Sequence, residues 1–431
     1  MQSSSKLDGA VSAVAKLRLP YPYLTTYHAI PTSEHHLKIQ LSEDGPESPP
    51  QDLHSNDLQH RALEPPQGTL PEVSNNSAWA RARRSYSTTI TWHESQPSLA
   101  QIWLVVYMIF TQTPDHEVFR MRLEGPSAAK VAHQLRNSTL AISHPSPEPS
   151  RPERNSKEGS DELIVLRSTF WQGAASPFGE RSVWIPSGGG SANVETVSYT
   201  MTTKFPDTRV HAWHPQRSAK PAPGSMIYSR YIPALDEHFS MIALDYENPE
   251  HLDLFHTWQN DPRVAAGWNE TGTLEEHRTY LRNLHEDPHV LTVIALFEDI
   301  PFAYFEIYWA AEDHLGAHYQ AEPFDRGRHA LVGNPEFRGR HRVTAWWSAT
   351  MHYIFLDDPR TDRVVGEPKY TNTSVLAYDL MHGFSVAKFV DLPHKRSALM
   401  ICSRERFFQL NALDHAGGVV GGTHVPLPAK I

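Results

Sequence analysis

A chain of 431 residues is long enough for two domains of ordinary size. Its net charge of −10 argues against a general affinity for nucleic acid or anionic membranes, so an anionic ligand must meet a local basic patch. The single cysteine, Cys402, excludes an intrachain disulfide and fits a reducing compartment. The 26 histidines do not fall into HxH or Cys/His spacing, and we therefore predict no metal site.

The longest apolar run, residues 102–110, is about half as long as a helix that spans a bilayer. Residues 1–10 lack the basic and then apolar order of a secretory signal. We therefore interpret the run as a buried strand or helix segment and expect no membrane association.

Two polar stretches interrupt the N-terminal half, residues 41–76 and residues 144–159. Both are rich in Pro, Ser and Glu and poor in aromatic residues, a composition typical of disordered insertions. Apolar patterns at residues 118–123 and 162–171 suit strands. We therefore predict that residues 1–209 form a mixed domain interrupted by loops, with no convergent catalytic chemistry.

Residues 210–237 resemble a linker, although part of this stretch can pack. The composition of the sequence changes after it. Across residues 238–412 aromatic residues are dense, proline is sparser, and strand and helix patterns alternate. Strands are predicted at 239–244, 290–298, 301–309, 329–333, 363–367, 384–392 and 397–403, and helices at 249–259, 273–286, 343–356 and 372–382. This order predicts an α+β fold with a mixed sheet and flanking helices. Residues 413–431 are expected to form a flexible tail.

The segment 333–343 joins a predicted strand to a predicted helix and carries a candidate phosphate site. Arg338, Arg340 and Arg342 alternate around Gly339. Glycine lets the backbone approach a ligand closely, while free N–H groups at a helix start and arginine side chains bind phosphate oxygens. The pattern fits a pyrophosphate such as that of coenzyme A, and a basic surface turn is the alternative.

Tyr304, Glu306 and Tyr308 recur at period two on one predicted strand, so their side chains project from the same face. Beside a phosphate loop this face is a candidate wall for the substrate. The alternative is the polar face of an exposed strand.

His329 and Glu367 each lie at an end of a predicted strand, and only the fold can bring them together. An imidazole that titrates near neutrality can accept the proton lost by an attacking amine or hydroxylamine. A nearby carboxylate would hold the tautomer of the imidazole or take the proton itself. The pair is therefore the candidate catalytic centre.

Several short motifs in this half add to these candidates. They are Tyr304-Phe-Glu-Ile-Tyr-Trp309, Asp325-Arg-Gly-Arg-His329, Phe337-Arg-Gly, Trp346-Trp347, Gly366-Glu-Pro368, Asn372, Leu392-Pro-His-Lys-Arg396, and His256-x-Trp258-x-Asn260-Asp-Pro-Arg263 with Trp268. In combination they resemble the siderophore N-acyltransferases, a family of the GCN5-related N-acetyltransferase (GNAT) superfamily. That family includes bacterial hydroxylysine acyltransferases of aerobactin and mycobactin synthesis and fungal hydroxyornithine acyltransferases.

The resemblance implies a GNAT fold with a split, mixed sheet for the C-terminal half, preceded by a degenerate copy of the same fold. It implies that His329 is the active-site histidine and that Glu367 stands where bacterial members have an aspartate. The loop from Phe337 to Val343 matches the pyrophosphate loop, and Asn372 matches a residue near the coenzyme A arm.

Three further matches concern the acceptor. His256, Trp258 and Trp268 match a segment that closes over the hydroxylamine substrate. The function implied is transfer of an acyl group from acyl-CoA to the hydroxylamino nitrogen of hydroxyornithine, which forms a hydroxamate. Acyl-CoA is then a co-substrate, and no tightly bound cofactor is expected.

The last residues, Ala429, Lys430 and Ile431, resemble the Ser-Lys-Leu peroxisomal address and predict an import receptor as a partner. In fungi the branch that loads the anhydromevalonyl group is the one associated with peroxisomes, so anhydromevalonyl-CoA is the predicted donor. Three alternatives stay open: a cytoplasmic acetyl-CoA-dependent hydroxyornithine acetyltransferase, a chance tail, and a non-catalytic scaffold of a siderophore assembly complex. The sequence leaves the oligomeric state open, and a homo-oligomer is compatible with it.

Overall fold

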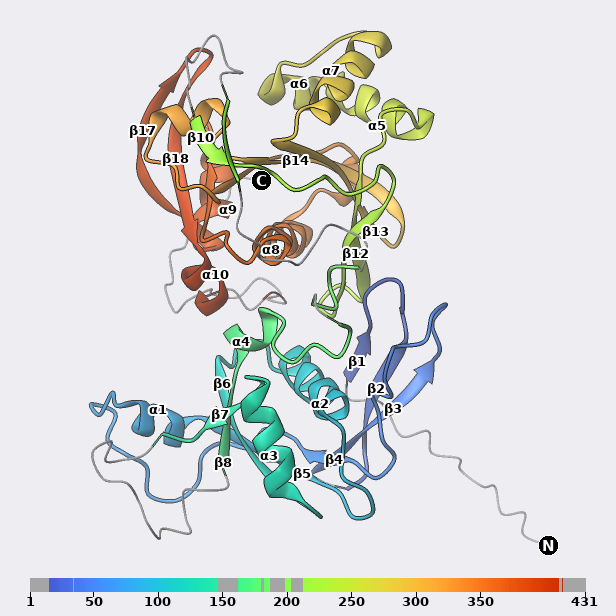
Figure 1. Ribbon diagram of the computed structural model, residues 1–431, viewed down its shortest axis with the longest axis vertical. Coiled ribbons are helices and arrows are strands. Elements are labelled where there is room, and N and C mark those ends of the chain that lie inside the picture. Colours follow the sequence, from blue (N-terminus) through green and yellow to red (C-terminus); the bar gives the residue numbers. More distant parts are fainter. Residues whose placement is uncertain are drawn as a thin grey trace, which may run out of the picture. The chain divides into compact units, whose positions relative to one another are not determined.

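The computed structural model describes residues 15–33, 35–145, 162–179, 182–186, 198–202, 212–410 and 413. The chain divides into two compact units, Met1–Gly179 and Glu180–Ile431, each built around an eight-stranded sheet (Figure 1). The insertion predicted at residues 144–159 lies outside the described residues from position 146 onward, as does the tail from residue 414. Among the helices within these ranges, none has the length and apolarity to span a bilayer.

The first unit contains strands and helices in the following order. They are β1 (Ala15–Arg18), β2 (Thr26–Pro31), β3 (His36–Glu43), β4 (Gln59–Arg61), α1 (Ala78–Arg84), β5 (Tyr86–Thr91), α2 (Leu99–Gln112), β6 (Val118–Glu124), α3 (Ala128–Asn137), β7 (Ile142–Ser143), β8 (Glu162–Leu166) and α4 (Arg167–Trp171).

The second unit begins with a small two-stranded sheet and then builds its main sheet and helices. They are β9 (Tyr199–Thr202), β10 (Ala212–Pro215), β11 (Met226–Ile232), β12 (Glu237–Ala243), α5 (Pro249–Gln259), α6 (Pro262–Trp268), α7 (Leu274–Glu286), β13 (Val290–Phe297), β14 (Ile300–Trp309), η1 (His314–His318), β15 (Arg326–Val332), η2 (Pro335–Phe337), α8 (Arg340–Asp357), β16 (Arg363–Gly366), α9 (Thr373–Met381), β17 (Ser385–Leu392), β18 (Lys395–Ser403) and α10 (Arg404–Leu410).

The two main sheets have the same topology. Their strand orders are β1-β2-β3-β4-β5-β6-β8-β7 and β11-β12-β13-β14-β15-β16-β18-β17, which correspond strand for strand. In each sheet one neighbouring pair is parallel, β5 with β6 and β15 with β16, and a helix, α2 or α8, connects that pair. The predicted degenerate copy of the fold is therefore confirmed.

The copies differ at the parallel pair of strands in each sheet. Strands β5 and β6 stay paired from Tyr86↔Phe119 to Thr91↔Glu124, so the first sheet is continuous. Strands β15 and β16 pair only at Arg326↔Val364 and Gly327↔Val365 and then diverge. The second sheet is therefore split, as the resemblance implied, while the described part of the first sheet is not.

A second difference lies between the second and third strands of each sheet. In the first unit β2 turns directly into β3. In the second unit α5, α6 and α7 occupy this position and appear as one group of helices in Figure 1. Asn248 caps α5, Asp261 caps α6, and Thr273 forms a capping box with Glu276 on α7, so local sequence specifies all three helix starts.

The predicted insertion at residues 41–76 is wrong, because this segment packs. It supplies β4, which pairs with both β3 and β5. Leu53 and Leu58 are buried, and the Asp57 carboxylate accepts the backbone N–H of Glu94 at 2.7 Å. Two leucines and one well-placed carboxylate are enough to order a segment whose average composition is polar.

The predicted linker at residues 210–237 is also wrong. It contributes β10 and the edge strand β11, which pairs with β12 from Tyr228↔Met241 to Ile232↔Glu237. Ile227, Tyr228 and Ile232 are buried within the second unit's fold. The second unit therefore begins at residue 180, well before residue 238, because an apolar strand follows the Pro-rich stretch.

Gly333, just beyond β15, lets the ring of Trp258 lie directly against the backbone. A β-carbon at this position would lie 2.0 Å from Cγ of Trp258. We expect Gly333→Ala to lower the free energy of unfolding by about 1–3 kcal/mol in denaturant titrations, because the core must move to admit the methyl group. The control is Gly267→Ala in α6, where the added carbon meets nothing within 4 Å. An equal effect of the two substitutions would contradict this packing.

Candidate active site

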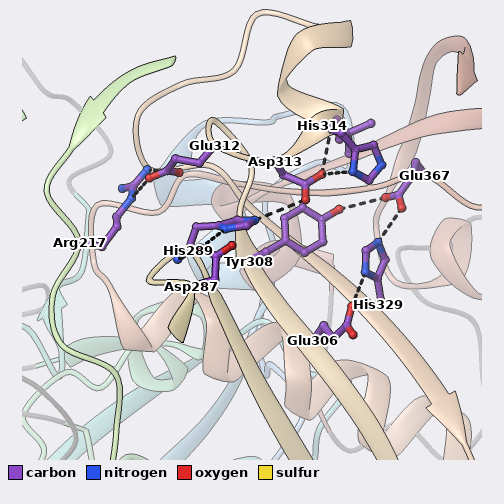
Figure 2. Close-up of polar contacts among 11 residues, drawn as sticks. Arg217, Asp287, His289, Glu306, Tyr308, Glu312, Asp313, His314, His329 and Glu367 are labelled. Atoms are coloured by element: carbon purple, nitrogen blue, oxygen red, sulfur yellow. Dashed lines mark hydrogen bonds and ion pairs between the residues drawn. The ribbon is translucent and has the colours of Figure 1, made fainter. Parts of the chain in front are cut away.

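His329 lies on β15 directly opposite Glu306 on β14. Its Nδ1 is 2.9 Å from Oε2 of Glu306, and its Nε2 is 2.7 Å from Oε1 of Glu367, which follows the last residue of β16 (Figure 2). Because β15 and β16 separate after Gly327 and Val365, the His329–Glu367 contact spans the split close to its start. The fold thus brings the predicted pair together and adds Glu306 to it.

Tyrosine hydroxyls hold both carboxylates. Tyr280 from α7 and Tyr304 from β14 donate to Oε1 of Glu306 at 2.7 and 2.9 Å. Tyr308 donates to Oε2 of Glu367 at 3.0 Å. Tyr304 and Tyr308 are fully buried and therefore support the carboxylates instead of forming the open substrate wall that their spacing suggested.

The two carboxylates determine the charge of the imidazole. Burial alone would lower the pKa of His329, but Glu367 and Glu306 raise it well above 6.5. Burial would raise the pKa of Glu367, and the charge of His329 instead lowers it on balance. The two carboxylates therefore favour the protonated form of the imidazole. The His329 side chain is 29% exposed, against 8% for Glu306 and 3% for Glu367, so a substrate reaches the imidazole first.

Trp268, at the end of α6, covers this centre. Its ring lies edge-on to His329, with 6.1 Å between ring centroids, and 5.8 Å from Tyr304. Trp258 is instead buried in the core, and His256 contacts His277 with 2.9 Å between their Nδ1 atoms. Of the three residues predicted to close over the hydroxylamine, the structure brings Trp268 alone to His329.

The loop before α8 has the backbone expected of a phosphate site. Gly339 has a φ of 150° and directly precedes the 18-residue helix α8, whose first N–H groups are available to an anion. Phe337 and Val343 are buried, and their backbone N–H groups already donate to the oxygens of Asn334 and Gly339 at 3.3 and 3.1 Å. Asn372 caps α9 by accepting the backbone N–H of Val375 at 3.3 Å.

The predicted arginine ligands of this loop have other partners. Arg338 donates to the backbone oxygens of Val332 and Gly333 and to the carboxylate of Asp261. Arg342 pairs with Glu237, with 2.6 Å between Nη2 and Oε1. The side chain of Arg340 lies outside the described part of the structure. Arg338 and Arg342 therefore stabilise the loop from within.

The first unit does not repeat this centre in its described residues. The cross-strand pairs of β4 and β5, which correspond to β14 and β15, are Gln59↔Thr91 and His60↔Ile90. Neither pair joins a histidine to a carboxylate. Across the described ranges as a whole, no group of three or more His, Cys, Asp or Glu side chains could hold a metal ion.

Comparisons with known proteins identify the family of this chain. Residues 247–392 match the family model described as an acetyltransferase (GNAT) domain. The chain is 49% identical over 439 residues to the N(5)-hydroxyornithine:cis-anhydromevalonyl coenzyme A-N(5)-transacylase of Beauveria bassiana, covering 96% of each chain. It is 48% identical to the hydroxyornithine transacylase of Ajellomyces capsulatus, covering 96% of this chain and 97% of that one, and 47% identical to a putative O-acetyltransferase of Stachybotrys chartarum, covering 99% of each. The chain therefore belongs to the GNAT acyltransferase family that includes the fungal hydroxyornithine transacylases.

Proposed function

We propose that this enzyme transfers the acyl group of cis-anhydromevalonyl-CoA to the hydroxylamino nitrogen of N-hydroxyornithine, which yields a hydroxamate for siderophore synthesis. The observation that carries the proposal is the Glu306–His329–Glu367 triad at the start of the split between β15 and β16. The printed activities of the Beauveria bassiana and Ajellomyces capsulatus relatives support the choice of acceptor, and the former supports the choice of donor.

The split sheet and α8 would bind different parts of the donor, acyl-CoA. The pantetheine arm and thioester would lie in the opening between β15 and β16, and the pyrophosphate would meet the N–H groups at the start of α8. Arg338 and Arg342 already have carboxylate partners within the protein. The pyrophosphate would therefore be bound by backbone N–H groups and not by these two side chains.

The triad would manage the proton of the reaction. The hydroxylamino nitrogen attacks the thioester carbonyl, an N–C bond forms and the C–S bond breaks. His329, in its neutral form and with one ring nitrogen released from its carboxylate, takes the proton from the attacking nitrogen and returns it to the sulfur of departing coenzyme A. Glu306 and Glu367 make the imidazole a stronger base, although they reduce the fraction that is neutral at pH 7.

A competition between donors tests the acyl group. Purified protein receives N-hydroxyornithine with equal concentrations of cis-anhydromevalonyl-CoA and acetyl-CoA, and the products are counted by mass spectrometry. We expect the anhydromevalonyl hydroxamate to dominate. A dominant acetyl product would establish the rival acetyltransferase. The absence of any product with a protein that still binds coenzyme A would favour the scaffold.

We further propose a peroxisomal location, on the strength of Ala429-Lys430-Ile431, which lies outside the described residues. The full chain, fused at its N-terminus to a fluorescent protein, should gather in peroxisomes of a fungal cell. Removal of the last three residues should release it into the cytoplasm. An identical distribution of the two fusions would remove the support for this address.

A further inference from the structure

A small cluster of Lys395, His394 and His314 lies beside the triad, next to Glu367. Lys395 opens β18 directly after the two-residue turn Pro393-His394 of the β17–β18 hairpin. Its Nζ is 3.6 Å from Oε1 of Glu367, the same oxygen that contacts His329. The Lys395 side chain is 23% exposed, so its ammonium is open to a ligand as well as to Glu367.

Backbone pairing holds Lys395 in this place. The chain that leaves β16 through Glu367 continues alongside β18, where Lys369 bridges to Ser397 and the N–H of Ala398 donates to the oxygen of Pro368 at 3.0 Å. The hairpin turn is therefore tied to the arm of the split that carries Glu367.

Two histidines, His394 and His314, add potential N–H donors to the cluster. Burial lowers the pKa of His394, and the charges of Lys395 and His314 lower it further. His314 lies close enough to Glu367 to contribute to the lowered pKa of that carboxyl (Figure 2). Nδ1 of His314 is 3.1 Å from Asp313, while its Nε2 has no hydrogen-bond partner among the described residues. The partly exposed ammonium of Lys395 and the Nε2 of His314 can therefore both donate to a further anion.

We propose that Lys395, assisted by His314 and His394, binds the α-carboxylate of hydroxyornithine and so makes the enzyme specific for an amino-acid acceptor. This inference rests on the proposed function. Nε2 of His329 and Nζ of Lys395 both contact Oε1 of Glu367, at 2.7 and 3.6 Å, so the imidazole and the ammonium lie close together. A nitrogen positioned at His329 therefore leaves the carboxylate within reach of the cluster. An acceptor that lacks the α-carboxylate would not form this contact with the ammonium of Lys395 and should therefore bind more weakly.

The test compares two acceptors that differ in this one group, N-hydroxyornithine and N-hydroxyputrescine, through kcat/KM with a constant acyl-CoA. We expect the wild-type enzyme to prefer N-hydroxyornithine by about 10- to 100-fold, the range of a hydrogen bond to a charged group. Lys395→Met should remove most of this preference by raising the KM for N-hydroxyornithine alone. Lys395→Arg should restore part of it, and Lys388→Met on the exposed face of β17 should leave it unchanged.

The contradicting outcomes separate this inference from the proposed function. If the wild type acylates both acceptors equally, the carboxylate subsite is overturned while the acyl transfer stands. If Lys395→Met lowers kcat equally for both acceptors, or raises the KM for acyl-CoA instead, Lys395 serves Glu367 or the donor and the inference again fails. If the wild type acylates neither acceptor, the proposed function itself fails.

Discussion

Replacement of His329 by alanine is expected to lower kcat for hydroxamate formation by about 10²- to 10⁴-fold, the usual contribution of a general base. His329 is the exposed member of a triad whose carboxylates are buried, so its removal takes away the group most open to a substrate. The binding of acyl-CoA should survive, because the split between β15 and β16 and the start of α8 do not depend on the imidazole. Steady-state kinetics and calorimetric titration with coenzyme A measure the two effects separately.

The matched control is His28→Ala on β2 of the first unit, where a half-exposed histidine is removed far along the chain from the triad. It should leave kcat unchanged. Turnover of His329→Ala within a few-fold of wild type would contradict the assignment of His329 as the base, and it would also be the result that the scaffold alternative predicts in cells.

The second large effect concerns pH. Because His329 acts in its neutral form and its pKa is raised well above 6.5, kcat/KM of the wild type should rise with pH beyond neutrality. Glu306→Gln removes one of the two charges that raise this pKa while the amide keeps its contacts with Tyr280 and Tyr304. The rise should then move to lower pH by about 1–3 units, and Glu367→Gln should move it in the same direction.

The same pKa shift predicts how stability depends on pH. A pKa that is raised in the folded state contributes its full stabilisation below the ordinary histidine pKa and loses it as the pH rises through the raised value. Glu306→Gln should therefore reduce the free energy of unfolding more at pH 6 than at alkaline pH. An unshifted rate profile would refute the role of Glu306. A Glu367→Gln variant inactive at every pH, beside a merely shifted Glu306→Gln, would identify Glu367 as the proton acceptor.

The sequence predicted the second unit well because its signals are local. Strand period, helix caps and the order of elements are each set by neighbouring residues. They placed Glu367 correctly at the end of a strand, but they put His329 at the start of a strand, whereas it lies in the middle of β15. The split itself follows from the order of strands in a GNAT sheet, which the motifs indicated. Glu306 was found through its period-two spacing with two tyrosines, although it proved to hold the imidazole and not to form an open wall.

The sequence-based predictions failed where the hydrogen-bond or ion-pair partner of a residue lies far away in the sequence. Tyr280 donates to Glu306 from a helix 26 positions earlier, and nothing in the spacing of α7 distinguishes it from a core tyrosine. Arg338 and Arg342 looked like phosphate ligands because Asp261 and Glu237 lie 77 and 105 positions away. The segment at residues 41–76 was predicted to be disordered because its average composition is polar. Its two buried leucines, Leu53 and Leu58, hardly change that average.

The first unit keeps the strand order of the second while its parallel strands stay paired from Tyr86↔Phe119 to Thr91↔Glu124. A continuous sheet has no opening between strands in which a pantetheine arm could lie. The chemistry that we propose therefore belongs to the second unit alone, where α5 to α7, the split and the triad occur together.

The most direct test is the site of acylation in the product, because relatives of this chain include a putative O-acetyltransferase as well as hydroxyornithine transacylases. The enzyme is incubated with N-hydroxyornithine and cis-anhydromevalonyl-CoA, and the product is examined by tandem mass spectrometry and by ferric-complex absorbance. We predict that the acyl group is attached to the hydroxylamino nitrogen and that the product forms a coloured ferric hydroxamate. An ester on the hydroxylamino oxygen that gives no ferric complex, or no acylated product, would contradict the account.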